Sequence, residues 1–104
     1  MANSSDIKKI ALETLALESD SIKNLSKVID DNYVKIVETL NRCEGKIILT
    51  GIGKSAIISM KISATLNSTG SKSTFLHLGD AFHGDLGVID RNDIVICLSK
   101  SGES

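Results

Sequence analysis

A short apolar run that leads directly into a glycine turn, over residues 46–55, constrains the fold more than any other stretch of the sequence. Residues 47–49, Ile-Ile-Leu, show no alternation of apolar and polar side chains, which is typical of a strand covered on both faces. Gly51 and Gly53 end the run, and a helical pattern begins at once. Strand, glycine turn and helix in this order present backbone N–H groups and a helix N-terminus to an anion.

Two further helices are predicted before this unit, because apolar residues recur there at spacings of four and seven. Ser4 or Ser5 is a candidate N-cap for the first helix, and Asp31 for a second helix that runs to about Cys43. The apolar stripe widens and the charges do not pair regularly, so it favours packing in a core or between subunits over a coiled-coil seam.

The elements that follow the turn indicate a parallel sheet. The pattern predicts a helix to about Ser68, a strand over residues 74–77, an irregular or short helical stretch over 79–89, and a third buried strand over 94–98. The crossovers are long enough for parallel strands, and the order α-α-β-α-β-(α)-β describes about half of a doubly wound, flavodoxin-like sheet. We therefore expect an α/β chain, with residues 1–44 as a helical scaffold and residues 45–104 as the first part of a longer α/β domain.

Composition argues against several classes of function. The formal net charge of −1 provides no basic field for a nucleic acid or an anionic membrane surface. No apolar run approaches the length of a membrane span, and the N-terminus lacks the order of a signal peptide. Cys43 and Cys97 show no metal-ligand spacing, so we expect buried, reduced thiols in a cytoplasmic protein.

The glycine turn is compatible with more than one kind of site. A phosphate-binding P-loop would need glycine at position 48, where the chain has Ile48. A dinucleotide-binding turn fits Gly51, Gly53 and Ala56, but the second strand closes on His77 and not on an acidic residue. The glycines could also serve only a close approach of helix and sheet.

A second polar loop favours a phosphorylated ligand. Residues 99–104, Ser-Lys-Ser-Gly-Glu-Ser, leave the third strand as residues 51–55 leave the first. The carboxyl ends of parallel strands meet at one edge of a sheet, where open α/β folds bind ligands. Hydroxyls around a glycine before a helix suit phosphate oxygens. Together the two loops predict a site for a phosphorylated small molecule.

Four blocks of sequence, residues 51–55, 61–70, 77–87 and 99–104, closely resemble the KpsF/GutQ family of D-arabinose-5-phosphate isomerases, which are built on the sugar isomerase (SIS) domain. The blocks occur in order with matching spacing and cover most of the chain. The resemblance implies that D-ribulose 5-phosphate and D-arabinose 5-phosphate are interconverted by a homotetramer that requires no cofactor, at the start of the route to Kdo for lipopolysaccharide or capsule. Many members carry CBS domains after the SIS domain; we expect none in this chain.

The resemblance also implies roles for individual residues. Isomerisation needs an acid/base group that reaches two neighbouring carbons and a cation for the enediolate oxygen. Lys54 matches a position suited to that charge, and His83 a position suited to proton transfer or substrate orientation. His77 matches a substrate contact where zinc can bind. The other substrate-binding positions are Gly53, Ser55, Gly70, Ser71, Ser99, Ser101, Glu103 and Ser104.

Some features depart from the family pattern. Ala56, Asp80 and Lys100 stand where glycine, glutamate and asparagine are usual. The family's catalytic glutamate lies just beyond Ser104 and a further catalytic histidine later, so we expect an N-terminal portion that is inactive alone. Two alternatives are a non-catalytic SIS module that binds a sugar phosphate as a regulatory signal, and an assembly fragment without a ligand.

Overall fold

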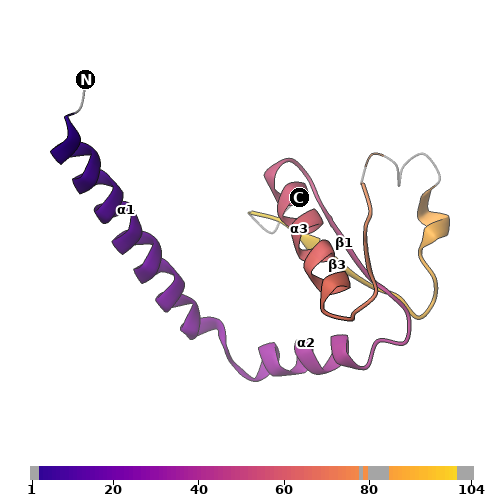
Figure 1. Ribbon diagram of the computed structural model, residues 1–104. Coiled ribbons are helices and arrows are strands. Elements are labelled where there is room, and N and C mark those ends of the chain that lie inside the picture. The colour runs from indigo at the N-terminus through magenta and orange to yellow at the C-terminus, as the bar shows by residue number, and fades with distance from the viewer. Residues whose placement is uncertain (1–2, 78, 80–84, 101–104) are drawn as a thin grey trace. The chain divides into compact units, whose positions relative to one another are not determined.

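The computed structural model describes residues 3–77, 79 and 85–100 (Figure 1). Its elements are α1 (Ser4–Asn24), the 3₁₀ helix η1 (Leu25–Val28), α2 (Asp31–Asn41), β1 (Ile47–Gly51), α3 (Lys54–Ser68), β2 (Ser73–Phe75), the 3₁₀ helix η2 (Asp85–Val88) and β3 (Ile94–Leu98). The chain divides into two compact units, Met1–Val37 and Glu38–Ser104. Each unit is described by itself.

Both N-terminal helices begin with a side-chain cap that lies earlier in the sequence than predicted. Asn3 Oδ1 accepts a hydrogen bond from the Asp6 N–H group at 2.9 Å, so neither Ser4 nor Ser5 caps α1. Asp30 Oδ1 accepts from the Tyr33 N–H group at 2.9 Å. The predicted cap, Asp31, is instead the first residue of α2, which ends at Asn41 and not at Cys43.

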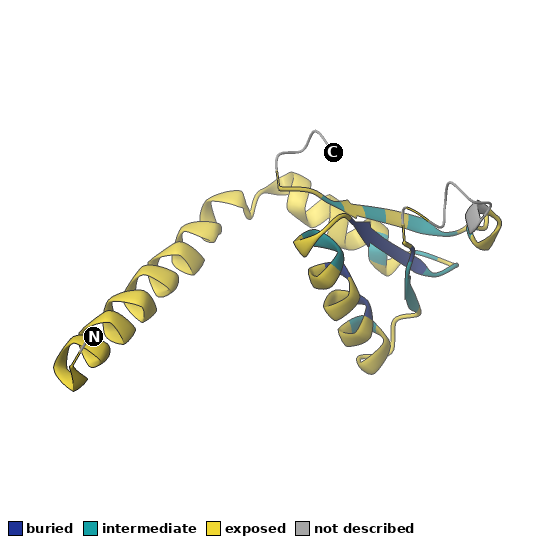
Figure 2. Cartoon of the chain, turned by 90° about the horizontal axis from the view of Figure 1, so that it is seen from above, coloured by how far each residue is buried: buried dark blue, intermediate teal, exposed yellow. Residues whose placement is uncertain are grey.

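The residues of the first two helices are almost all exposed (Figure 2). No residue of α1 or α2 is buried, and Leu15, Ile22 and Ile36 are 62%, 68% and 58% exposed. The predicted packing of these helices into a core is therefore wrong for the described part of the chain. Packing between subunits stays a prediction. None of the described helices has the length and apolar character needed to cross a membrane.

The three strands form a parallel sheet in the order β2-β1-β3, as the crossover lengths predicted. Ile47 pairs with both Ser73 and Ile94, and at the other end of β1 Gly51 pairs with Leu98. Helix α3 connects β1 to β2 and packs against the strands (Figure 1). Strand β2 ends at Phe75, so the predicted strand over residues 74–77 is one residue late at its start and two residues too long at its end.

The core of the second unit is centred on β1. All five residues of β1 are buried (Figure 2). Ile48 packs with Leu76 and Ile89. Strand β3 forms an edge of the described sheet, and its alternate residues Val95 and Cys97 are exposed. The prediction of a third buried strand is therefore wrong.

The prediction of buried cysteines is wrong as well. Cys97 is exposed because it lies on the open face of β3, and Cys43 is only half-buried. The Cys43 Sγ atom lies 3.5 Å from the Asn92 carbonyl oxygen. Both thiols are free.

Candidate functional site

The turn between β1 and α3 depends on two glycines for two different reasons. Gly51 lies against the first turn of α3: a Cβ atom at this position would come within 2.8 Å of the carbonyl carbon of Ser55. Gly53 has φ +62°, a backbone conformation that side chains disfavour, and it directly precedes Lys54, the first residue of α3. The turn therefore brings the N-terminus of α3 close to the carboxyl end of β1.

Buried hydroxyl groups fasten this helix end to the sheet. Ser59 is fully buried, and its Oγ atom lies 2.8 Å from the Ser55 carbonyl oxygen and 3.1 Å from the Thr50 carbonyl oxygen. Thr50 Oγ1 in turn donates to the Leu76 carbonyl oxygen at 2.6 Å. These bonds fix α3 against β1, and β1 against the segment after β2.

A hollow of about 540 Å³ opens at this edge of the sheet, between the start of α3 and the end of β3. Its described lining consists of Lys54, Ser55, Ile58, Cys97, Leu98, Ser99 and Lys100. A smaller hollow of about 160 Å³ shares four of these residues and extends to Thr50, Gly51 and Ile52. The structure thus brings together the two loops that the sequence predicted to meet, with Lys54, Ser55 and Ser99 in one place.

The hollow is electropositive. Two of its lining residues are lysines and none of the described ones is acidic. Within the described part of the chain, neither Lys54 nor Lys100 has an ion-pair partner. The N-terminus of α3 adds a partial positive charge, while the Ser55, Ala56 and Ile57 N–H groups already donate to the Ile52 and Gly53 carbonyl oxygens. An anion of the size of a phosphate group therefore matches this hollow in charge.

His77 lies close to this edge of the sheet but lines neither hollow. It is exposed, its Nδ1 atom accepts a hydrogen bond from the Gly79 N–H group at 3.2 Å, and its ring meets Phe75 edge-on at 6.1 Å between centroids. No group of three or more described His, Cys, Asp or Glu side chains could hold a metal ion. Zinc at His77 stays a prediction.

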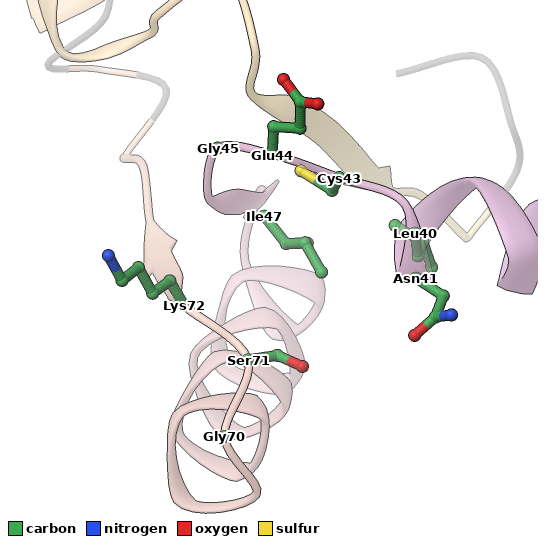
Figure 3. A pocket seen from close by; sticks show the side chains of 9 residues that line it. All are labelled: Leu40, Asn41, Cys43, Glu44, Gly45, Ile47, Gly70, Ser71 and Lys72. Carbon is green, nitrogen blue, oxygen red and sulfur yellow. The ribbon is translucent and has the colours of Figure 1, made fainter.

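Gly70 and Ser71 lie at the opposite edge of the sheet. They follow α3 and precede β2, and they line a separate hollow of about 390 Å³ near the start of β1 (Figure 3). The structure therefore does not bring them together with Lys54 and Ser99 within one chain. The remaining predicted site residues, His83, Ser101, Glu103 and Ser104, lie outside the described residues.

Sequence reasoning missed four residues that line the larger hollow, Ile58, Cys97, Leu98 and Lys100. Ile58 is four residues after Lys54 and so lies on the same face of α3, which the helical period could have indicated. Cys97 is the penultimate residue of β3, where its side chain reaches the edge of the sheet. Cys97 had been predicted as a buried thiol, and Lys100 was noted only as a departure from the family pattern.

An ion pair holds the amino edge of the sheet, away from the larger hollow. Lys46 Nζ lies 2.7 Å from Asp93 Oδ2, and Asp93 Oδ1 accepts from the Lys46 N–H group at 2.8 Å. The hydrogen bond from Lys46, with further bonds from the Asp90 and Lys46 backbone, lowers the pKa of Asp93 to about 2. The same bond raises the pKa of Lys46. This ion pair links the residue before β1 to the residue before β3.

A family model described as the SIS domain matches residues 40–104. The chain belongs to the SIS domain family. The arabinose 5-phosphate isomerase KpsF of Escherichia coli O6:H1 is 47% identical over 93 residues, which are 88% of this chain and 28% of that protein. The arabinose 5-phosphate isomerase KdsD of Escherichia coli K12 is 41% identical over 99 residues, 95% of this chain and 30% of that protein.

A solved structure shows the same SIS fold. It is an E. coli CFT073 protein in complex with arabinose 5-phosphate, which superposes with a TM-score of 0.90 at 34% identity. The match covers 99% of this chain and 55% of that one. The chain therefore spans about half of that structure, and 28–30% of the length of the two curated relatives.

Proposed function

We propose that this SIS domain forms the phosphate-binding part of a sugar-phosphate aldose–ketose isomerase that interconverts D-arabinose 5-phosphate and D-ribulose 5-phosphate. The observation that carries the proposal is the hollow at the carboxyl edge of the sheet, where Lys54 and Ser55 of α3 meet Ser99 of the loop after β3. The names of KpsF and KdsD support the substrate, as does the arabinose 5-phosphate complex of the E. coli CFT073 protein.

The hollow supplies two things that the reaction needs. Ser55 and Ser99 offer hydroxyl groups to the phosphate oxygens, and the N-terminus of α3 adds its partial positive charge. Lys54 follows the turn directly and supplies a cation for the oxygen on which enediolate charge develops. Proton transfer between the two carbons is assigned to His83, and Ser101, Glu103 and Ser104 extend the phosphate loop.

The setting of the enzyme forms part of the same proposal. The reaction begins the route to Kdo, takes place in the cytoplasm and is carried out by a homotetramer. The isomerase names of the relatives support the route. The exposed apolar faces of α1 and α2 support contacts between subunits, because such faces rarely remain uncovered in water. Gly70 and Ser71 lie at the opposite edge of the sheet from Lys54, so in this proposal they contribute to substrate binding from another subunit of the homotetramer.

Isomerase activity of the protein made from the complete reading frame tests the proposal. Turnover is followed by deuterium uptake from heavy water into arabinose 5-phosphate. We expect Lys54→Ala to lower kcat by about a hundredfold or more while KM changes less, because the enediolate charge exists only near the transition state. Lys61→Ala, an exposed lysine of α3 outside the hollow, is the matched control.

Two results would count against the proposal. Near-normal turnover of Lys54→Ala would remove this lysine from the chemistry. Tight binding of arabinose 5-phosphate by the wild-type protein without any deuterium uptake would instead identify a regulatory SIS module, since a sensor needs the phosphate site but no proton transfer.

A further inference from the structure

We infer that Lys100 recognises the phosphate dianion and makes the hollow selective for phosphate monoesters; this inference rests on the proposed function. Lys100 is the second residue after β3 and lines the hollow with Lys54, Ser55 and Ser99. It reaches the hollow from the loop after β3, whereas Lys54 reaches it from α3. The two cations therefore border the same space from two different elements.

Charge balance separates the roles of the two lysines. A phosphate monoester carries a charge of about −1.5 to −2 near neutral pH. The enediolate adds developing negative charge on another part of the same substrate, and the single charge of Lys54 is assigned to that oxygen. Without Lys100, the described lining would offer the phosphate only hydroxyl groups and the partial charge of a helix end.

The surroundings of Lys100 favour an ion pair with the ligand. No described acidic side chain lines the hollow, so none competes with the ligand for Lys100 within the described part of the chain. Ile58, Cys97 and Leu98 make the rest of the lining weakly polar, which reduces the water available to screen the pair. The described lining of the hollow thus presents two lysines without an ion-pair partner beside apolar surface.

Selectivity follows from the dependence of Coulomb energy on ligand charge. The interaction of a fixed cation with a dianion is about twice that with a monoanion at the same distance. A second cation therefore gains more affinity for a phosphate monoester than for a phosphodiester or a carboxylate. The class of ligand that fits the hollow is a small molecule with a terminal phosphate group.

Titration calorimetry on the protein from the complete reading frame tests this at low salt and mildly alkaline pH. Methyl phosphate is the dianionic probe and dimethyl phosphate the monoanionic probe. Lys100→Asn should bind methyl phosphate about three- to tenfold more weakly, as expected for an exposed charge-assisted contact. It should bind dimethyl phosphate only about 1.7- to 3-fold more weakly, the square root of the factor for methyl phosphate, because the Coulomb energy with a monoanion is about half as large. Lys61→Asn removes the same charge from α3 outside the hollow and should leave both affinities unchanged.

Kinetics separate this role from that of Lys54. In Lys100→Asn we expect KM for arabinose 5-phosphate to rise by the same factor while kcat stays near that of the wild type, because the phosphate is bound equally in ground state and transition state. Affinity of the variant for methyl phosphate should also depend less steeply on salt than that of the wild type.

The outcomes distinguish the two proposals. If Lys100→Asn binds methyl phosphate as tightly as Lys61→Asn, the inference is wrong, whereas isomerisation by the wild type would still uphold the proposed function. If Lys100→Asn loses methyl phosphate affinity but the wild type does not isomerise arabinose 5-phosphate, the phosphate site stands and the proposed function fails. If the wild type binds neither methyl phosphate nor arabinose 5-phosphate, both the inference about Lys100 and the proposed function are refuted.

Discussion

Replacing Gly51 by alanine tests the close approach on which the candidate site is built. Gly51 is buried at the carboxyl end of β1, and its φ lies outside the region that favours glycine. The change therefore adds one methyl group without imposing backbone strain of its own. That methyl group would lie 2.8 Å from the carbonyl carbon of Ser55 and 2.9 Å from its oxygen. Both are backbone atoms, so no side chain can turn aside to relieve the contact.

The structure sets the size of the effect. An ordinary contact begins at 3.4 Å, so the first turn of α3 must retreat by the difference of 0.6 Å. The bond between Ser59 Oγ and the Thr50 carbonyl oxygen is already 3.1 Å long and would not survive such a retreat. Overpacking costs about 1–3 kcal/mol and a lost buried hydrogen bond about 1 kcal/mol. We expect the free energy of unfolding to fall by about 2–4 kcal/mol.

Urea unfolding followed by far-ultraviolet circular dichroism measures this loss. Gly87→Ala is the matched control, because a Cβ atom there meets nothing within 4 Å. It should change the free energy of unfolding by less than about 1 kcal/mol, in the stabilising direction if at all. The slope of the transition should be the same for both variants. A Gly51→Ala protein as stable as Gly87→Ala would refute the close packing of α3 against β1.

Two further predictions concern the ion pair at the amino edge and the phosphate loop. Because the pKa of Asp93 is lowered from 3.8 to about 2, the Asp93 carboxylate stabilises the fold above pH 3.8, and this contribution is lost as pH falls toward 2. Thermal unfolding between these pH values should show that the wild type loses stability more steeply than Asp93→Asn does. Ser101→Ala should weaken arabinose 5-phosphate binding by about 1–3 kcal/mol through lost hydrogen bonds, and unchanged affinity in titration calorimetry would remove Ser101 from the site.

Much of the fold could be predicted from the sequence because the decisive signals are local. The unbroken apolar run of residues 47–49 and the crossover length specify a buried parallel strand without reference to the rest of the chain. Helix caps were predicted too late in the sequence because Asn3 precedes Ser4, and Asp30 precedes Asp31, in runs where each residue can cap. Local sequence does not decide between such neighbours.

Burial was harder to predict because it depends on what lies beside an element. The apolar composition of β3 indicates a strand but does not show that it forms an edge of the described sheet, where Val95 is 42% exposed. The apolar stripe of α1 likewise indicates a helix with one face to cover, but not what covers it. In both cases the pattern of apolar residues predicted the type of element, but it did not predict which neighbouring element would cover it.

The candidate site divides in the same way. The meeting of Lys54 with Ser99 was predictable, since the carboxyl ends of parallel strands share an edge. The same topological rule places Gly70 and Ser71 at the other edge, because they lie between a helix and the start of its following strand. The resemblance alone had grouped them with Lys54. The pairing of Lys46 with Asp93 joins residues 47 positions apart and leaves no local signal.

The positive charges at the two edges of the sheet have different partners, and that difference supports the proposed ligand site at the carboxyl edge. At the amino edge, Lys46 donates hydrogen bonds to Asp93 and to the Val88 carbonyl oxygen, so its charge is already paired within the fold. At the carboxyl edge, Lys54 and Lys100 have no ion-pair partner within the residues that the structure describes. A lysine that stabilises the fold gains from a fixed carboxylate, whereas a lysine that binds a ligand must stay unpaired until the ligand arrives. The lysine at the amino edge of the sheet is therefore neutralised by an ion pair, whereas the described lysines at the carboxyl edge remain available to an anion.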